Sequence, residues 1–458
     1  MTTWRRATAT AAATAATLTA GLLTATADAA AGPAEEAQRY LVVREGGTAA
    51  AAGRTTSAAV LARAAGGTDV TALSAIGAAV ADLTPAEAAR LDATPGLVVS
   101  PDSRTSLVDP VDSAAPRSRT GAAAVATSWG LDRVDQRARP LDGSYRRRPH
   151  VDGAGVHVYV IDTGISTWHP EFAGRVGAGY DAVGDGNGVE DCNGHGTHVA
   201  GTIASNIFGV APRATVHPIR VLDCNGDGWN SDFVEALDHV AAVAPARSVA
   251  NASLGSARDE AVNAAVANFV ATSTPLVVAA GNDDADVVDA SPASAPEAIT
   301  VAASTRGDVE ASYSNHGEEV DIYAPGSSID STYFADPAYY MTLSGTSMAA
   351  PHVAGYVALY LDVHPNAYVS TTTAALRAQA TPNRLSGVQG GGPNRLVYTY
   401  GIAYPQRTSF GTVARRTKVR LDVDQASEPR RGGSASRRRS GRGSGPSARC
   451  APGVRRRS

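Results

Sequence analysis

Ser347 stands where a hydroxyl group could act as a nucleophile. Residues 343–355 have the sequence LSGTSMAAPHVAG, a glycine-containing turn that opens into the small and apolar residues of a buried helix. The N-terminus of a helix favours a developing negative charge, because its dipole and unpaired N–H groups face that point. No bulky residue follows that would cover the hydroxyl. Serine is also a common helix cap, so this segment alone leaves both interpretations open.

Two upstream segments supply an acid and a base. Residues 156–165, VHVYVIDTGI, form an apolar run that ends in Asp162, as expected for a central parallel strand with an acid at its carboxyl end. Residues 193–202, NGHGTHVAGT, place His195 at the start of a helix of small residues. Acid, imidazole and hydroxyl are together the parts of an activated serine nucleophile.

These segments carry a family resemblance. The motifs DTGI (162–165), HGTHVAGT (195–202) and GTSMAAPH (345–352) appear complete and in the order Asp, His, Ser, which is the order of the subtilisin triad. The chain therefore resembles the subtilases, the subtilisin superfamily of serine proteases. WGLD (129–132), HPEF (169–172), DCNGH (191–195) and GPNRL (392–396) resemble the proteinase K and aqualysin branch. The likeness covers roughly residues 40–400.

The resemblance implies a role for each residue of the site. Ser347 would attack the scissile carbonyl, His195 would take its proton and pass it to the leaving amine, and Asp162 would orient the imidazolium. Asn282, at the end of the apolar run 277–280, matches the oxyanion-hole position of the family, although asparagine is also common in turns. His198, one turn after His195, is expected to pack.

Two other protease chemistries use parts of these motifs. A two-histidine metal site lacks an HExxH pattern and a third ligand. Aspartic proteases also use Asp-Thr-Gly, but they need two such carboxylates, and no second Asp-Thr-Gly or Asp-Ser-Gly occurs in the chain. A serine mechanism is therefore the prediction.

The resemblance also implies how a substrate would bind. Two segments match those that flank an extended peptide in the family, and backbone recognition of this kind gives broad specificity. Ala279, Ala280 and Gly281 would line a roomy, uncharged first-subsite pocket, which favours cleavage after aliphatic or aromatic residues. Asp227 is expected to add a weak preference for basic residues further along. The flanking segments are Ser253-Leu254-Gly255 and Gly226-Asp227-Gly228.

Structural calcium is a further implication of the resemblance. By likeness to proteinase K, Asp321 and the backbone carbonyls of Pro296 and Ala298 would form one site of hard oxygen ligands. A second site is implied by likeness to an aqualysin-type loop, with an exposed acidic loop as the alternative. Its ligands would be Asp132, Asp135, Gln136, Asp142 and Ser144.

The three cysteines and one proline complete the resemblance. Cys192 and Cys224 match one aqualysin-type disulfide, which suits an exported protein. The second disulfide of that branch has no counterpart, and Cys450 is left over in the C-terminal tail. Ser291-Pro292 matches a conformationally special X-Pro position of the family, for which a cis bond is an expectation.

The pattern along the chain predicts the elements that must position these residues. Short apolar runs at 156–161, 216–222, 248–254, 275–280 and 298–303 alternate with helical stretches at 195–205, 232–243, 260–272 and 348–363. Such alternation favours a parallel sheet with helices on both faces. We expect an α/β, three-layer subtilisin-like fold with a mainly parallel sheet, preceded by a small α+β domain.

Five regions are expected along the 458 residues. The arginines at positions 5 and 6, an apolar stretch and small residues predict a secretory signal, and the arginine pair leaves the twin-arginine route open. The second region resembles the subtilase propeptide, an inhibitor and folding template, with a separate binding domain as the alternative. A mature N-terminus is expected near residues 120–124. The regions are the signal peptide (1–31), the propeptide (35–109), a processing linker (110–121), the peptidase domain (122–400) and a basic tail (401–458).

The C-terminal tail is basic, whereas the rest of the chain is acidic. Residues 401–458 carry 15 Lys and Arg against 3 acidic residues, whereas the first 400 carry 25 against 41. Few apolar residues and many Arg, Gly and Ser favour disorder in the tail. It could bind nucleic acid or an anionic polymer, be a removable extension, or come from a shifted reading frame.

Together these features predict a secreted, extracellular serine endopeptidase that is monomeric, not membrane-bound and made as a self-processed precursor. Its partners would be protein and peptide substrates and its own propeptide. The competing class is a catalytically silent subtilase-like binding protein tethered by its tail. The presence of all triad residues, Asn282 and a propeptide favours the enzyme.

Overall fold

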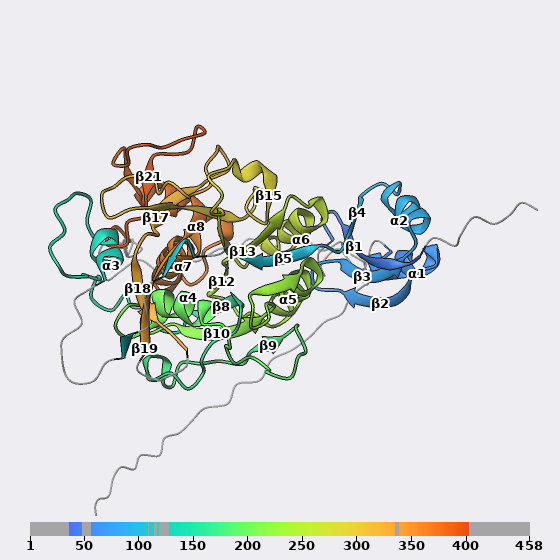
Figure 1. Cartoon of the computed structure of the whole chain (residues 1–458), viewed down its shortest axis with the longest axis horizontal. Coiled ribbons are helices and arrows are strands. Elements are labelled where there is room, and N and C mark those ends of the chain that lie inside the picture. Colours follow the sequence, from blue (N-terminus) through green and yellow to red (C-terminus); the bar gives the residue numbers. More distant parts are fainter. Residues whose placement is uncertain are drawn as a thin grey trace, which may run out of the picture. The chain divides into compact units, whose positions relative to one another are not determined.

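The computed structural model describes residues 36–47, 56–108, 110–113, 117–118, 128–334 and 339–402 (Figure 1). The expected signal peptide, most of the expected tail and Cys450 lie outside these residues.

The larger part of the described chain is built on a nine-stranded sheet. The order of its strands is β20-β21-β17-β16-β14-β12-β8-β10-β9. All neighbouring pairs are parallel except β20 with β21. The strands are β8 (His157–Asp162), β9 (Tyr180–Asp181), β10 (Thr215–Arg220), β12 (Ser248–Ala252), β14 (Leu276–Ala279), β16 (Ile299–Ser304), β17 (Ile322–Pro325), β20 (Thr381–Pro382) and β21 (Arg395–Leu396).

Helices cover both faces of this sheet. Val158 and Val160 of β8 pack in the core shared with α4 (His195–Ala204) and α7 (Thr346–Val363). Tyr159 and Ile161 alternate with them and pack on the other face, in the core shared with α5 (Asn230–Val243) and α6 (Glu260–Val270). A strand buried on both faces needs the continuous apolar run seen in the sequence. The three-layer α/β prediction is confirmed.

The predicted elements of these layers differ from the observed ones mainly at their ends. The run 248–254 is not one strand: β12 ends at Ala252, and β13 (Leu254–Ala257) leaves the main sheet to pair with other partners. Helix α7 begins at Thr346, so Pro351 lies inside it. The other elements of this part are α3 (Trp129–Val134), α8 (Val369–Gln379), η1 (Pro170–Phe172), η2 (Val287–Asp289), β15 (Ala290–Ser291), β18 (Ile329–Thr332) and β19 (Tyr339–Ser344).

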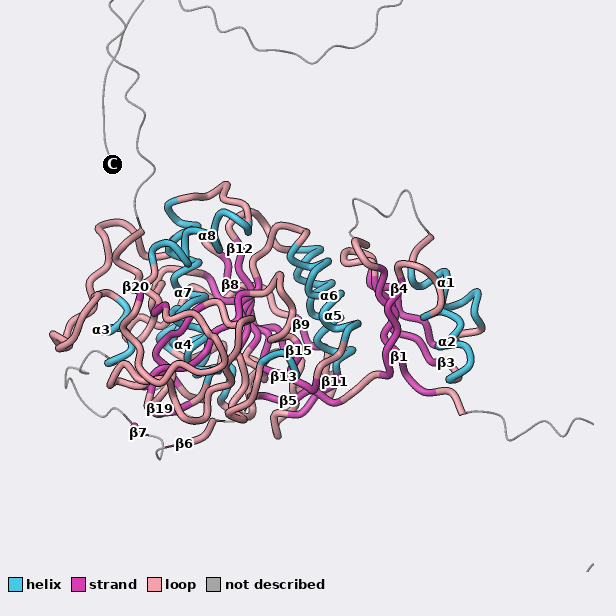
Figure 2. Tube along the Cα trace, turned by 90° about the horizontal axis from the view of Figure 1, so that it is seen from above, coloured by secondary structure: helices cyan, strands magenta, loops and turns pink. Residues whose placement is uncertain are grey.

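The N-terminal region forms a second small sheet with two helices (Figure 2). Ser57 caps α1 through its side chain, and Thr84 and Glu87 form a reciprocal capping box at the start of α2, as the sequence TPAE predicts. Strand β2 was not predicted, because its residues are mostly exposed and lack an apolar pattern. The order of the sheet is β2-β3-β1-β4, and the elements are β1 (Gln38–Arg44), α1 (Ala58–Ala65), β2 (Thr68–Leu73), β3 (Ala78–Leu83), α2 (Pro85–Asp92) and β4 (Leu97–Pro101).

This small sheet packs against helices α5 and α6. The carboxylate of Asp102 accepts hydrogen bonds from the N–H and hydroxyl of Ser231, at the start of α5. Asp238 of α5 accepts from the N–H groups of Ala75 and Ile76. Asn268 of α6 donates to the carbonyls of Arg44 and Ile76 and accepts from the N–H of Gly47. Backbone groups of the small sheet therefore rely on side chains of the larger part.

The segment after β4 continues along the larger part as paired backbone. Strand β5 (Arg104–Leu107) lies antiparallel between β11 (Asp227–Trp229) and β13. Two short strands follow, β6 (Asp112–Ser113) and β7 (Arg117–Ser118), and both pair with β19. The described part of the expected linker 110–121 is thus engaged in sheet pairing. The sequence of this linker does not predict a strand, because its pairing depends on β19, which lies far away in the sequence.

Among the described residues, no helix combines the length and apolar character needed to cross a bilayer.

Replacing Asn268 with alanine should loosen the N-terminal sheet from α5 and α6. Two carbonyls and one N–H in a buried contact would lose their partner, which typically lowers the free energy of unfolding by about 1–3 kcal/mol. The first transition in urea, measured on chains in which Ser347→Ala prevents self-cleavage, should move to lower concentration. Asn206→Ala, at an exposed position, is the control, and equal midpoints for the two variants would contradict this role.

Candidate active site

Asp162 and His195 form a buried pair at the carboxyl end of β8. The Nδ1 atom of His195 lies 2.8 Å from Oδ1 of Asp162, and both side chains are almost fully buried. The same oxygen accepts the N–H of Thr163 at 2.8 Å. A carboxylate on Nδ1 fixes the tautomer in which Nε2 carries no proton and can accept one. The pair can therefore act as an oriented base.

The backbone around His195 needs glycine on both sides. Gly194 has a φ of 109°, and a Cβ there would meet the ring of Tyr333 at 2.3 Å. A Cβ on Gly196 would lie 2.1 Å from the carbonyl oxygen of Gly164. Larger residues would displace the start of α4 from Asp162, which explains why the histidine is flanked by glycines.

Asp191 is a positioning residue that sequence reasoning missed. Its carboxylate accepts hydrogen bonds from the N–H groups of Asn193, Gly194 and Thr197 and from the hydroxyls of Thr163 and Thr197. Burial raises the pKa of Asp191, and these hydrogen bonds oppose that rise. Asp191 thereby ties the residue after Asp162 to the turn that carries His195. The acid at the head of DCNGH was the available signal.

His198 packs as expected. Its Nε2 lies 3.1 Å from the carbonyls of both Ile329 and Met341, between α4 and the β18–β19 hairpin. Burial, followed by the neighbouring His195, lowers the pKa of His198 to about 3. A neutral, buried imidazole that bonds to two carbonyls serves structure. Nothing in its surroundings provides a metal partner, since the described residues contain no cluster of three or more His, Cys, Asp or Glu able to hold a metal ion.

Ser347 lies in the first turn of α7, next to a carbonyl that the helix leaves unpaired. Pro351 has no N–H to donate to the carbonyl of Ser347 four residues earlier. That carbonyl instead accepts the hydroxyl of Ser253 at 3.2 Å. The proline thus lets the segment after β12 bind to the start of α7. The hydroxyl of Ser347 itself is fully buried, contrary to the expectation of an open position.

The cover over Ser347 is the chain's own residue Val108. The Ser347 hydroxyl donates to the carbonyl oxygen of Val108 at 2.9 Å. The N–H of Val108 donates to the carbonyl of Ser253, and the N–H of Leu107 donates to that of Gly226. These contacts extend the pairing of β5 with β11 and β13. Both segments expected to flank a peptide, 226–228 and 253–255, therefore flank residues 105–108 of this chain.

Asn282 is held beside Ser347 by the start of α7. Its Oδ1 accepts the N–H and the hydroxyl of Thr346, each at 2.9 Å. This orients the amide so that Nδ2 faces Gly345, where an added Cβ would lie 3.0 Å from it. Asn315, which sequence reasoning missed, braces the same loop by accepting the N–H groups of Asp283 and Ala285. An amide donor fixed in this way suits the stabilisation of an oxyanion.

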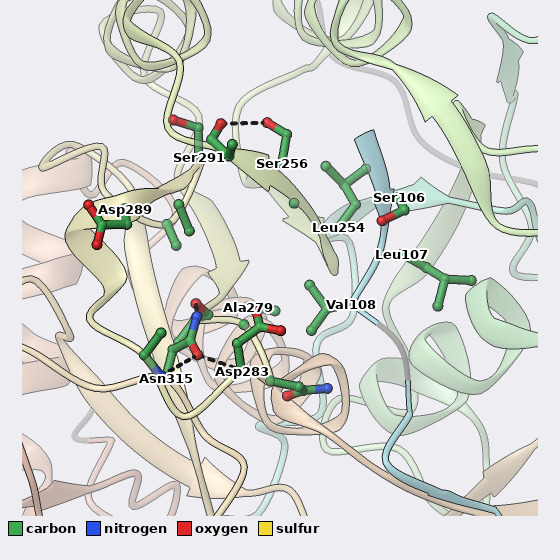
Figure 3. Close-up of a pocket in the computed structure, with 18 of the residues that line it drawn as sticks. Ser106, Leu107, Val108, Leu254, Ser256, Ala279, Asp283, Asp289, Ser291 and Asn315 are labelled. Carbon is green, nitrogen blue, oxygen red and sulfur yellow. Dashed lines mark hydrogen bonds between the residues drawn. The ribbon is translucent and has the colours of Figure 1, made fainter. Parts of the chain in front are cut away.

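A pocket of about 590 Å³ opens beside Val108 (Figure 3). Ala279, Ala280 and Gly281 line it, as expected, and Ser256 and Ala290 contribute further small residues. The expectation of an uncharged pocket is wrong. Asp283, Asp286 and Asp289, all exposed, are also among its lining residues, because the loop after β14 and the turn η2 run along its wall.

Cys192 and Cys224 are joined in a disulfide with a Cα–Cα distance of 5.0 Å. This bond links the turn before His195 to the segment before β11. The Ser291–Pro292 and Arg139–Pro140 peptide bonds are both cis.

The two expected calcium sites differ in how well they fit the ion. Around the loop after α3, burial and then the charges of Asp132 and Asp142 raise the pKa of Asp135 to about 6. Carboxylates are the ligands that a hard cation takes, but among the described residues these do not form a group of three able to hold a metal ion, and they accept hydrogen bonds from the backbone of residues 142–146. At the other site, the Asp321 carboxylate is paired with Arg377. That carboxylate does not fit the ion, because an arginine already neutralises it.

Known proteins resemble this chain over the part that holds these residues. The profile of the subtilase family matches residues 153–401. An extracellular serine proteinase from Thermus sp. (strain Rt41A) is 50% identical over 272 residues, 59% of this chain and 66% of that protein. Alkaline serine exoprotease A from Vibrio alginolyticus is 44% identical over 271 residues, 59% of this chain and 50% of that protein.

A solved structure resembles the chain as well. A cold-adapted subtilisin-like serine proteinase matches with a TM-score of 0.58 and 44% identity, over 60% of this chain and 99% of that one. The chain spans between half and two thirds of the lengths of the two curated relatives. Because the family match covers more than half of the chain and includes the strand end, the helix starts and the oxyanion loop described above, the chain belongs to the subtilase family.

Proposed function

We propose that this protein is a secreted serine endopeptidase of broad specificity that is made as a self-processing precursor. The observation that carries the proposal is the peptide carbonyl of Val108 bound to the Ser347 hydroxyl, within a cleft that also holds Asn282. The buried Asp162–His195 pair and the oriented Asn282 amide favour an enzyme over a binding protein. The extracellular serine proteinase among its relatives agrees with export.

The contacts of Ser347, His195 and Asn282 support the following mechanism for peptide-bond hydrolysis. The Ser347 Oγ attacks the carbonyl carbon while His195 takes its proton, and Asp162, hydrogen-bonded to Nδ1, stabilises the imidazolium. The oxyanion that forms accepts from the Nδ2 of Asn282 and the N–H of Ser347. His195 then protonates the leaving amine. Water repeats the sequence on the acyl-enzyme and restores the serine.

The N-terminal domain acts first as an inhibitor and then as the first substrate. Residues 105–108 lie as an added strand with Val108 at the nucleophile, so the first bond cut is Val108–Asp109. After the cut, the pairing of β5 and the contacts with α5 and α6 keep the domain bound. The expected N-terminus near residues 120–124 then requires a second trimming step. That region lies outside the described residues.

Substrates bind through their backbones, and the pocket beside Val108 sets the preference at the cleaved position. Small apolar walls admit aliphatic and aromatic side chains, and Val108 is itself aliphatic. The three carboxylates on its wall oppose acidic side chains and tolerate a lysine. Structural calcium would be held by the loop after α3, through Asp132, Asp135, Gln136, Asp142 and Ser144, where it would neutralise the acidic cluster. We expect the enzyme to act as a monomer.

The Ser347→Ala precursor should stay uncut. Wild-type protein should first show a new N-terminus at Asp109, because the Val108 carbonyl of the inserted segment accepts the Ser347 hydroxyl at 2.9 Å, and later one near residues 120–124. Intact mass and N-terminal sequencing over time, with a serine-directed fluorophosphonate probe, separate these states. A mutant that matures unaided, or a wild type that shows no Asp109 species at early times, would contradict the proposal. An unlabelled, uncut wild type would favour the binding-protein alternative.

Asn282→Ala should lower kcat by about 10²–10³-fold with little change in KM, the loss typical of one oxyanion donor, with subtilisin as the measured example. Maturation would slow for the same reason, so the variant is best matured by added wild-type enzyme and then purified. Asn206→Ala, at an exposed position, is the control. A loss confined to KM would assign Asn282 to substrate binding.

Peptides that differ only at the cleaved position test the pocket. We expect kcat/KM to be highest for Leu and Phe, lower for Lys and lowest for Glu, with the Lys-to-Glu ratio falling as salt is added. Replacing Asp283 and Asp289 with asparagine should reduce that ratio and leave Leu and Phe unchanged. Equal rates for Lys and Glu would show that the carboxylates do not reach the substrate.

A further inference from the structure

We infer that Arg377 takes the place of a calcium ion at Asp321, so that this site is stabilised by a guanidinium built into the chain and is independent of metal. The relevant residues come from three elements that meet at one side of the main sheet. Asp321 directly precedes β17, Thr300 lies in β16, and Arg377 lies in the last turn of α8.

The Asp321 carboxylate is buried and fully engaged. It is 6% exposed, and its Oδ2 accepts the N–H of Thr300 at 2.9 Å. The N–H of Asp321 donates in return to the carbonyl of Thr300 at 2.9 Å, which locks the residue to β16. Oδ1 accepts both the Nε of Arg377, at 3.0 Å, and its Nη2. Each oxygen therefore already has its donors.

A calcium ion at this carboxylate would have to displace the guanidinium. Calcium takes six to eight oxygen ligands at about 2.3–2.6 Å, so an oxygen that accepts two guanidinium N–H groups has no free direction for it. A second cation, Arg395, lines the same cavity of about 460 Å³ and also acts on the charge of Asp321. Glu318 is the other acidic residue of the lining, and it is exposed. Two positive charges near one buried carboxylate oppose a divalent ion.

An arginine in the place of a calcium ion changes what the stability of the region around Asp321 depends on. A bound metal stabilises a fold by mass action, in proportion to the logarithm of its free concentration. An arginine on α8 is present at unit stoichiometry, and it joins that helix to the strands β16 and β17. The region around Asp321 should therefore hold without calcium, whereas the acidic loop after α3 remains free to respond to the ion.

Thermal unfolding with EDTA and with excess Ca²⁺ tests this inference. The background is Ser347→Ala, which removes autolysis, with Asp142→Asn, which weakens the other candidate site. In this background Ca²⁺ should not raise Tm. Arg377→Ala should lower Tm by several degrees in EDTA and introduce a Ca²⁺-dependent recovery, with a gain in Ca²⁺ affinity on the order of 10-fold or more as the competing charge is lost. Arg377→Gln offers a second variant if Arg377→Ala folds poorly.

Arg384→Ala is the matched control, because it removes one exposed arginine from the segment after α8. It should change neither Tm nor the response to Ca²⁺. The inference would be overturned if the background with Arg377 intact already gained Tm from Ca²⁺ and lost that gain on Asp321→Asn. It would also be overturned if Arg377→Ala behaved like Arg384→Ala. Neither reading uses peptidase activity, so failure here leaves the proposed function untouched.

Discussion

The carboxyl edge of the main sheet is the constraint on which the rest of the structure depends. Its strands are covered by helices on both faces, so polar groups within them would lose water without gaining partners. Functional side chains can stand only where a strand ends or a helix begins. Asp162 ends β8, Ser253 follows β12, Asn282 follows β14, and both His195 and Ser347 occupy the first turns of helices. These groups are thus gathered at one edge of the sheet, where buried polar side chains such as Asp162 and His195 find hydrogen-bond partners.

Two kinds of hydrogen bond hold these side chains in position. Side-chain acceptors bind backbone N–H groups, as Asp191 does around the His195 turn and Asn315 does around the oxyanion loop. The proline inside α7 frees a carbonyl that then binds Ser253. A hydrogen bond in a buried place is modest in net energy but expensive to lose. Such networks therefore fix geometry more than they add stability.

The two acidic sites expected to bind calcium differ in how their negative charge is balanced. In the loop after α3, burial and then repulsion from Asp132 and Asp142 raise the pKa of Asp135. At Asp321 the chain supplies its own cation. The difference follows from one residue on α8, a helix that the sequence pattern did not predict.

The sequence by itself determined the fold class, the capping box at the start of α2 and the motifs that mark the family. Those features are local or periodic: apolar runs define strands, TPAE defines a cap, and DTGI, HGTH and GTSMA carry their chemistry within a few residues. Only the tertiary structure decided the rest. The seating of Val108 on Ser347, the pairing of residues 112–118 with β19, the acidic wall of the pocket and the Arg377–Asp321 pair join positions distant in sequence. Such contacts leave no periodicity and arise only when separate elements pack.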